Sequence, residues 1–344
     1  MHGYHYILII GLLALFMVFI YYIGRIVELS SAIKGKPSGG SPAGNSFVGF
    51  LFMLIGFVFL IGSVWSFVEY KDTFLPESAS YEGVFIDDMI ELTFIITGIV
   101  FILTHIALFF FAWKYRYFKT RKAEFLPHNN KLEVIWTVVP SIVLSFLIYE
   151  GITAWDDIMA PPDEAKCEVI EVTAKQFGWV FRYPGPDGIM GKRSFSLIDD
   201  NASNEIGLDT TDTKGSDLNG DGVSDAKDDL YSSDLVLPKD KDVLVRLRAR
   251  DVLHSFYLPH FRLKMDCVPG MPTHLNFMAK YTTLEMRNIL NDQDFNFELA
   301  CAEMCGTGHY GMMKEVRVIT LDEYKAWVQK QFEDNKTYLS LLRQ

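Results

Sequence analysis

Soft donor side chains are concentrated in one stretch of the sequence, CAEMCGTGHYGMM, at residues 301–313. Within it, Cys301, Cys305, His309 and Met312 follow the spacing Cys-x3-Cys-x3-His-x2-Met. Thiolate and thioether sulfur select copper, zinc or iron–sulfur clusters. Structural zinc sites usually add a second ligand pair and lack a thioether, and iron–sulfur clusters generally need more than two thiolates. These donors therefore favour copper. A further histidine from a neighbouring strand would complete a site in which two copper ions share both sulfurs.

The overall composition limits the alternatives. The chain has 344 residues, only four cysteines and a formal net charge of -11. So few cysteines in a chain of this length argue against a disulfide framework. We therefore expect Cys301 and Cys305 to be ligands, and Cys167 and Cys267 to be buried apolar residues. The acidic balance argues against nucleic acid as a partner and suits a basic partner protein.

The first part of the chain contains four apolar stretches, at residues 6–23, 47–67, 89–113 and 134–154. Each approaches the roughly 20 residues that a helix needs to span a bilayer. The first stretch resembles a secretion signal in length. It lacks basic residues before it and a small-residue cleavage site after it, so we interpret it as a retained helix. Residues 31–46, rich in Gly, Ser and Pro, form a linker between the first two stretches.

Loop charges predict the orientation of these helices, because basic loops stay on the cytoplasmic side. The loop between the third and fourth stretches carries Lys114, Arg116, Lys119, Arg121, Lys122 and Lys131 against Glu124. The connection between the second and third stretches carries Asp72, Glu77, Glu82, Asp87 and Asp88. Both chain ends should therefore face outward, and the residues after about 156 should form a membrane-anchored domain on the outer face.

This second part of the chain alternates short β-rich runs with turns. Runs such as CEVIEVTAKQFGWVFRYPG and MMKEVRVIT are rich in Val, Ile, Phe and Tyr, with Pro or Gly at their joins. The pattern predicts an antiparallel sandwich or a Greek-key barrel. Thr320 and Glu323 have the spacing of a capping box, which predicts a C-terminal helix that packs onto the sandwich.

Several motifs in the same order resemble one family, subunit II of the haem–copper cytochrome c oxidases. They are LEVIWTVVPS, AKQFGWVFRYPG, DVLHSFYLPHFRLKMDCVPGM and the cysteine loop itself, and the match extends from about residue 89 to the C-terminus. The resemblance implies a cupredoxin-like Greek-key sandwich on the periplasmic face of a bacterial plasma membrane. We expect three parts: two extra N-terminal helices (1–70), the family's helix pair (71–155) and the copper domain (156–344) with an acidic insertion at about 199–234.

The resemblance also implies a ligand set for a dinuclear copper centre. By position, the two thiolates bridge both ions, His254 and Met312 complete one ion, and His309 and the Glu303 carbonyl complete the other. The implied ligands are thus His254, Cys301, Glu303, Cys305, His309 and Met312. The neighbouring His260, His274 and Met313 do not match family positions, and we expect them to be ordinary residues.

Further roles are implied for residues outside the copper ligands. The Glu303 side chain would bind magnesium shared with subunit I, although alone it is simply a residue of a turn. Glu133 would lie at the mouth of a proton-uptake path, whereas without the resemblance it is a favourable acidic residue at a helix start. The family's electron-accepting tryptophan is replaced by Phe177, and Trp179 keeps the second aromatic position. His105, deep in a predicted span, should contact a partner subunit.

The function implied is that of a respiratory oxidase subunit. It would take electrons from cytochrome c, or from a membrane-attached cytochrome domain, and pass them to haem in subunit I, where oxygen is reduced to water and protons are pumped. Three rivals remain: a copper-free quinol oxidase subunit, a nitrous oxide reductase and a membrane-anchored copper carrier. The complete ligand set argues against the quinol oxidase subunit, and the membrane anchor argues against the nitrous oxide reductase. The two expected copper ions argue against the copper carrier. The two extra helices would contact lipid and another subunit or respiratory complex.

One motif lies outside the resemblance. The stretch DLNGDGVSDAKD has the spacing of a calcium-binding loop. Its candidate ligands are Asp217, Asn219, Asp221, Val223, Asp225 and Asp228, with Gly222 at the turn position. The last position is Asp rather than a longer bidentate Glu, and no flanking helix pair is evident. A solvated acidic insertion is the alternative.

Overall fold

We describe a computed structural model of the chain, covering residues 3–33, 42–118, 120–160, 162–185, 188–202, 204–211 and 226–341. The chain comprises two compact units. One comprises Met1–Phe74 and Thr93–Val139, and the other comprises Leu75–Leu92 and Pro140–Gln344. Most of the predicted calcium loop, including Asp217, Asn219, Asp221, Val223 and Asp225, lies outside the described residues. The calcium site and the domain boundaries given above therefore stay predictions.

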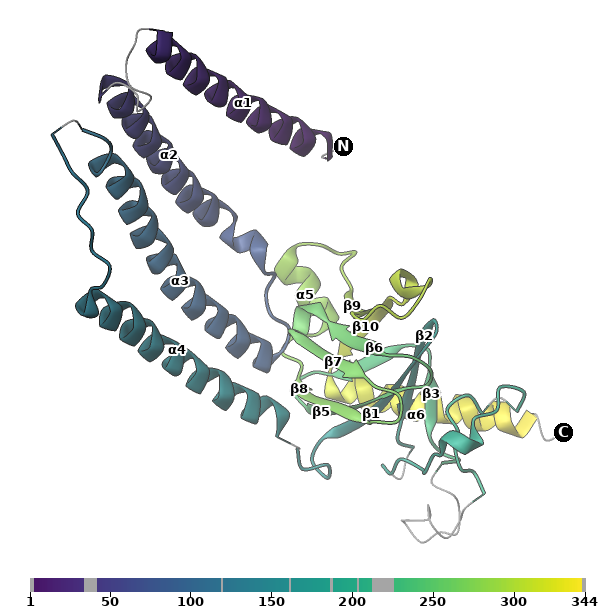
Figure 1. The fold of residues 1–344 in the computed structure, drawn as a ribbon. Coiled ribbons are helices and arrows are strands. Elements are labelled where there is room, and N and C mark those ends of the chain that lie inside the picture. The colour runs from purple at the N-terminus through teal and green to yellow at the C-terminus, as the bar shows by residue number, and fades with distance from the viewer. Residues whose placement is uncertain are drawn as a thin grey trace. The chain divides into compact units, whose positions relative to one another are not determined.

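Four long helices make up the first part of the chain (Figure 1): α1 (Gly3–Ile33), α2 (Pro42–Phe74), α3 (Tyr81–Lys114) and α4 (Asn130–Met159). Among the described residues, three helical stretches are long and apolar enough to cross a membrane: Gly44–Lys71, Tyr81–Lys114 and Asn130–Met159. Three of the four predicted spans are thus confirmed as long apolar helices. The first span falls in α1, where many side chains lie outside the described residues, and it stays a prediction.

Small residues allow α2 and α3 to pack closely within their unit. A Cβ added at Gly56 would lie 2.2 Å from the ring of Phe109, so only a glycine leaves room for this side chain. His105, on α3, lies in the same contact, with its ring centroid 5.7 Å from that of Phe59 on α2. Its Nδ1 is 2.8 Å from the Phe101 carbonyl oxygen. The predicted contact of His105 with a partner subunit stays a prediction.

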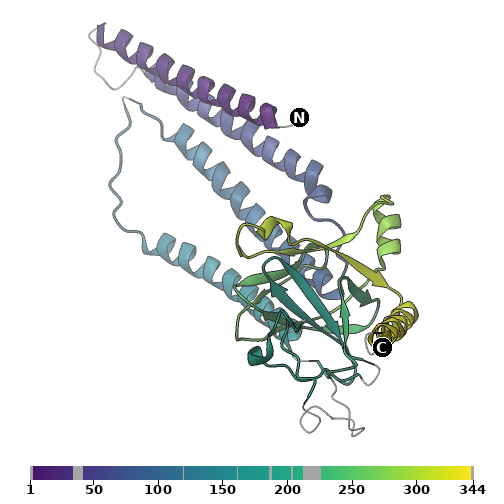
Figure 2. The same ribbon diagram turned by 90° about the vertical axis from the view of Figure 1, so that its right-hand side faces the viewer.

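The second part of the chain folds into a sandwich of two five-stranded sheets, seen from two sides in Figures 1 and 2. One sheet has the order β3-β2-β1-β5-β8, and the other has the order β4-β10-β9-β6-β7. The strands are β1 (Glu168–Lys175), β2 (Gly178–Tyr183), β3 (Leu230–Ser232), β4 (Leu235–Pro238), β5 (Asp242–Ala249), β6 (His254–Leu258), β7 (Leu263–Cys267), β8 (Thr273–Met278), β9 (Phe297–Cys301) and β10 (Lys314–Ile319). The predicted sandwich is therefore confirmed.

Strand direction differs from the antiparallel prediction in two places. β1 pairs with β5 in parallel, and β10 pairs with β4 in parallel, while the other ladders are antiparallel. Parallel neighbours need a long connection between them, and the segments between β1 and β5 and between β4 and β10 provide it. The Greek-key connectivity itself stays a prediction.

Two helices complete this unit. The predicted C-terminal helix is α6 (Leu321–Leu341), and its capping box is present: the Thr320 amide donates to Glu323 Oε2 at 3.0 Å. The shorter α5 (Thr283–Leu290) was not predicted from the sequence. It begins with another capping box, in which Thr282 and Glu285 exchange hydrogen bonds, and this spacing was the signal that could have revealed it.

A buried ion network lies in the first sheet. Arg182, on β2, is 1% exposed and contacts Glu171 on β1 at 3.1 Å and Asp229 at 2.9 Å. Glu171 also accepts from Arg193 at 2.8 Å and from Arg248 at 2.7 Å. Burial alone would raise the pKa of Glu171, but the three arginine charges outweigh it and lower that pKa to about 2.

We predict that Arg182→Ala lowers the free energy of unfolding by about 3–5 kcal/mol, because it leaves two buried carboxylates without their shared cation. Thermal melting of the detergent-solubilised protein measures this. Arg246→Ala is the control: the pair of Arg246 with Glu164 is partly exposed, so its loss should cost less than about 1 kcal/mol. Equal melting temperatures for the two variants would contradict the prediction.

The same network predicts an acid-dependent loss of stability. The folded-state pKa of Glu171 lies below its ordinary value of 4.5, so ionised Glu171 stabilises the fold fully above pH 4.5. This contribution is lost as the pH falls from 4.5 towards about 2. In Glu171→Gln the melting temperature should therefore depend less on pH over this interval than in the parent protein.

Candidate metal centre

The cysteine loop joins β9 to β10 and faces the start of β6. Cys301 is the last residue of β9, and its register partner on β6 is Phe256, two residues after His254. His309 lies in the short helix η3 (His309–Gly311), and Met312 follows it. Antiparallel pairing of β6 and β9 thus brings a histidine from one strand to the thiols of a loop distant in sequence.

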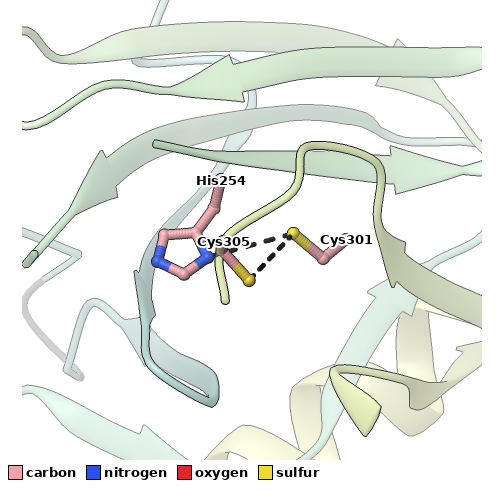
Figure 3. Close-up of side chains that lie close together, drawn as sticks. All are labelled: His254, Cys301 and Cys305. Atoms are coloured by element: carbon pink, nitrogen blue, oxygen red, sulfur yellow. Dashed lines mark hydrogen bonds between the residues drawn. The ribbon is translucent and has the colours of Figure 1, made fainter. Parts of the chain in front are cut away.

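The donor atoms of this cluster face one another, as Figure 3 shows for His254, Cys301 and Cys305. The Cys301 sulfur lies 3.9 Å from His254 Nδ1 and 4.0 Å from the Cys305 sulfur. The Cys305 sulfur lies 3.6 Å from His309 Nδ1 and 3.4 Å from the Met312 sulfur. The Glu303 carbonyl oxygen is 3.2 Å from the Cys301 sulfur. The structure therefore brings together all six residues of the predicted ligand set.

These spacings fit donors arranged around metal ions. Sulfur and nitrogen ligands at about 2.0–2.3 Å from a tetrahedral metal lie about 3.3–3.8 Å from each other. The donors here are 3.2–4.0 Å apart, and His254, Cys305 and Met312 are buried. Both cysteines are free thiols. Two thiols, two imidazoles and a thioether are soft or borderline donors, which suit copper.

Burial disfavours the thiolate form of Cys305 in the absence of a metal. Desolvation, together with the neighbouring Cys301, raises the pKa of Cys305 to about 11. A thiol ligates a metal as the thiolate, so metal binding must release protons from this cluster. Affinity for a thiophilic ion should accordingly rise with pH.

A carboxylate behind His254 orients its ring. Asp251 Oδ1 lies 2.8 Å from His254 Nε2, so that nitrogen donates and leaves Nδ1 free to face the sulfur of Cys301. Burial alone would raise the pKa of Asp251, but hydrogen bonds from His254, Gln176 and Val252 lower it. The sequence pattern alone indicates no role for Asp251, although it lies three residues before a predicted ligand.

The turn between β1 and β2 covers the cysteine loop. The Gln176 amide donates to Asp251 Oδ2 at 2.7 Å, and its side chain donates to the Cys305 carbonyl. The ring of Phe177 lies on Gly306 and Gly308: an added Cβ would lie 2.9 Å from Phe177 at the first and 2.5 Å at the second. The loop therefore needs glycine at both positions to accept this ring.

The two aromatic residues predicted to accept electrons occupy different depths. Phe177 is 44% exposed, at the surface of the loop, whereas Trp179 is 6% exposed beneath it. Trp179 Nε1 donates to the Met312 carbonyl at 3.1 Å, and its ring meets that of Phe256 edge to face. An exposed ring thus contacts the loop directly, and a buried ring supports it from behind.

The other histidine and methionine residues near the predicted ligands in sequence lie outside the donor cluster. His260 packs against Phe295 and Phe297, and His274 lies on β8 opposite Arg246. Met313 is 53% exposed, whereas Met312 is 1% exposed beside Cys305. These placements agree with the choice of His254, His309 and Met312.

The two remaining cysteines differ from each other. Cys267 is buried on β7 opposite His254, as predicted, and burial raises its pKa to about 12. The prediction was wrong for Cys167, which is only half-buried: its sulfur lies 3.7 Å from the Glu164 carbonyl at the loop before β1. A residue in the loop before a strand retains solvent contact that residues within the strand lose.

Two predicted functional carboxylates lie outside the donor cluster. The side chain of Glu303 is exposed, while its carbonyl faces Cys301. Glu133 Oε1 accepts from the Asn129 amide at 3.2 Å, and Asn129 Oδ1 accepts from the Leu132 amide at 3.2 Å. Glu133 therefore caps the start of α4. Magnesium binding and proton uptake by these residues stay predictions.

Known protein families resemble this chain in both of its parts. Residues 68–150 match the family "Cytochrome C oxidase subunit II, transmembrane domain", and residues 169–319 match "Cytochrome C oxidase subunit II, periplasmic domain". The chain is 34% identical to the alternative cytochrome c oxidase subunit 2 of Bradyrhizobium diazoefficiens over 257 residues, which cover 75% of this chain and 82% of that one. It is 28% identical to cytochrome c oxidase subunit 2 of Thermostichus vulcanus over 287 residues, which cover 79% and 82%.

Among solved structures, the chain is similar to the periplasmic domain of subunit II of cytochrome oxidase of Bradyrhizobium japonicum. The sequence identity is 23%, the match covers 51% of this chain and 99% of that chain, and the TM-score is 0.33.

We predict that Asp251→Asn weakens copper binding by about 10–100-fold, because the amide cannot accept from both His254 and Gln176. Competition between the purified protein and a copper chelator measures the affinity. Glu298→Gln, which changes an exposed carboxylate on β9, is the control and should bind copper like the parent. Unchanged affinity in Asp251→Asn would show that this carboxylate does not orient the ligand.

Proposed function

Since the chain belongs to the cytochrome c oxidase subunit II family, we propose that it holds a dinuclear copper centre in a bacterial respiratory oxidase. The chain accepts electrons from cytochrome c, or from a membrane-attached cytochrome domain, and passes them to the haem-containing subunit I. Oxygen is reduced to water there, coupled to proton pumping. The sandwich lies on the outer face of the plasma membrane. The observation that carries the proposal is the convergence of six donor residues, from two strands and one loop, on a single buried cluster.

Each donor has a place in this proposal. Cys301 and Cys305 would hold both copper ions, His254 and Met312 would be further ligands of one ion, and His309 with the Glu303 carbonyl would be further ligands of the other. A pair of copper ions that shares two thiolates supplies one-electron redox chemistry. Cys301 and His254 are fixed by the β6–β9 ladder, and Met312 is fixed by Trp179, so these donors need not move when the charge changes.

Exposed apolar side chains surround the loop and suit contact with other proteins. We call Phe177, Leu253, Met304, Tyr310 and Met313 the loop collar; each is between 44% and 84% exposed. Exposed apolar residues clustered in this way are typical of protein interfaces. The collar would serve the electron donor and subunit I, and Phe177 would be the side chain at which electrons arrive.

Two carboxylates complete the proposal. The exposed Glu303 side chain, adjacent to the ligands, would bind magnesium at the contact with subunit I, because carboxylate oxygen suits this hard ion. Glu133, at the cytoplasmic start of α4, would lie at a proton-uptake path of subunit I in addition to capping the helix. The two N-terminal helices would contact other oxidase subunits or another respiratory complex.

We predict that the purified chain binds two copper ions, and that Cys305→Ser removes at least one because the serine oxygen is a poor bridge for copper. Metal analysis and electron paramagnetic resonance measure the stoichiometry and the sharing of one electron between two nuclei. Cys167→Ser is the matched control, because Cys167 lies outside the cluster, and it should retain two ions. A parent protein that binds one ion would favour a copper carrier instead.

We predict that Phe177→Ala slows reduction of the loaded centre by reduced cytochrome c by about tenfold, because it removes the exposed ring that contacts the loop. Stopped-flow absorption measures the rate. Phe195→Ala removes an even more exposed phenylalanine from the short helix η1 (Phe195–Leu197) and should leave the rate unchanged. Equal rates for both variants would exclude Phe177 as the accepting side chain.

A further inference from the structure

The turn between β6 and β7 contacts the outer end of α3 and the residues that precede it. Both segments belong to the same compact unit. The Ala79 amide donates to the His260 carbonyl at 2.7 Å, and Ser80 Oγ donates to the Phe261 carbonyl at 2.7 Å. A Cβ at Gly83, in the first turn of α3, would lie 2.9 Å from the Phe261 carbonyl oxygen. The turn and the helix start are therefore packed backbone against backbone.

One ion pair crosses this contact. Arg262 Nε donates to Asp87 Oδ1 at 2.7 Å, and Arg262 Nη2 donates to Asp87 Oδ2 at 2.9 Å. The arginine side chain is 8% exposed, and its Nη1 also donates to the Pro259 carbonyl at 3.1 Å. A planar guanidinium held at both carboxylate oxygens is a geometrically specific contact, unlike a single surface ion pair.

The backbone at Arg262 is unusual for such a residue. Its φ of +59° lies in the left-handed region. Glycine adopts this conformation without steric strain, whereas residues with a Cβ do not. A turn selected only for its shape would place glycine at this position. Arginine adds strain to the backbone and, in exchange, supplies the forked contact to Asp87. An unfavourable conformation that is kept for one side-chain contact points to a role for that contact.

The turn is the far end of the strand that carries a copper ligand. β6 begins at His254 and ends at Leu258, so the ligand lies about 13 Å along the strand from the start of the turn. β6 also pairs with β9, which carries Cys301. A fixed turn therefore fixes the height of both ligands above the outer end of α3.

The chain itself also connects the sandwich to the helices. α4 ends at Met159 and β1 begins at Glu168, so a short segment connects the sandwich covalently to the membrane helix before it. A single covalent connection leaves rotation about itself free. Contacts at the outer end of α3 remove that freedom: besides the Arg262–Asp87 pair, the Lys280 amide donates to the Ala79 carbonyl at 2.8 Å, and the Met278 amide donates to Glu82 Oε2 at 3.1 Å.

We propose that the Asp87–Arg262 pair is a positioning device that holds the copper-bearing hairpin on α3 and thereby sets the distance for electron transfer to subunit I. This inference rests on the proposed function. The hydrogen bonds of Arg262 go to Asp87, Pro259 and Pro76 and not to the metal ligands, so the pair acts through the position of β6. The donor cluster should therefore form normally without the pair, whereas electron transfer from the copper centre to subunit I should be slower.

The test uses the complete oxidase complex with Arg262→Gly, which removes the ion pair and relieves the left-handed backbone strain at the same time. We expect unchanged copper content and copper spectrum. After photochemical reduction of the copper, electron transfer to haem should be slower by about tenfold. Arg262→Lys should restore part of the rate, because lysine keeps the charge but not the fork. Asp87→Asn should behave like Arg262→Gly.

Asn291→Gly is the matched control. Asn291 also has a left-handed backbone, with φ of +51°. It caps the C-terminal end of α5 and is not part of the Asp87–Arg262 pair. It should leave the electron-transfer rate unchanged. An Arg262→Gly complex that transfers electrons as fast as the parent would overturn the proposal.

A second measurement does not depend on copper. Hydrogen exchange of the 75–92 segment, measured by mass spectrometry, should be faster in Arg262→Gly than in the parent and in Asn291→Gly. Unchanged exchange would overturn the positioning role even if the copper centre is present. A parent complex without copper, but with faster exchange in Arg262→Gly, would instead reject the proposed function and leave the attachment supported.

Discussion

The pairing of β6 with β9 places an imidazole from one strand beside a thiol from another, and the rest of the donor cluster depends on it. Phe256 opposes Cys301, so His254 lies on the same core-facing side as the thiol. Side chains alternate along a strand, and a slip of one residue would turn His254 away from Cys301. The loop alone could supply Cys305, His309 and Met312, but without this register it would lack the donor that closes the cluster. The apolar core that holds the two strands is thus a condition for the site.

Burial of the donor cluster disfavours charged thiolates in the absence of a metal. Apolar surroundings raise the pKa of Cys305, and two sulfurs 4.0 Å apart would repel each other as thiolates. A cation that binds both sulfurs relieves this repulsion, so the close approach of the two sulfurs favours a shared metal. Asp251 contributes from outside the cluster. It holds the ring of His254 with one oxygen and the turn of Phe177 with the other, so one carboxylate connects a ligand to the exposed aromatic ring.

The parts that could be predicted from the sequence are those encoded locally. The spacing of Cys301, Cys305, His309 and Met312 lies within one loop, and the apolar helices and the cap of α6 are likewise local patterns. The parallel pairing of β1 with β5 could not be predicted, because it depends on which distant strand fills the edge beside β1. The network around Arg182 depends on four further segments for the same reason, those that carry Glu171, Arg193, Asp229 and Arg248. α5 and Asp251 are different cases, because the sequence does contain a signal for each. The capping box at Thr282 and Glu285 indicates the start of α5. Asp251 lies three residues before His254, and the structure shows that it accepts a hydrogen bond from this histidine.

One sheet of the sandwich carries the donor cluster, and the other carries the buried ion network that stabilises the fold. The sheet that contains β6, β9 and β10 carries the donor cluster and the turn with Arg262, whereas the sheet that contains β1, β2 and β5 carries the buried ion network. The sheets meet at the cluster through Trp179 of β2, which donates to the Met312 carbonyl, and through the Gln176 side chain, which donates to the Cys305 carbonyl. Because both of these bonds end on main-chain oxygens of the loop, the first sheet supports the shape of the loop without supplying any ligand. Loss of the Arg182 network should therefore reduce the population of folded protein while leaving the donor geometry of the molecules that remain folded intact.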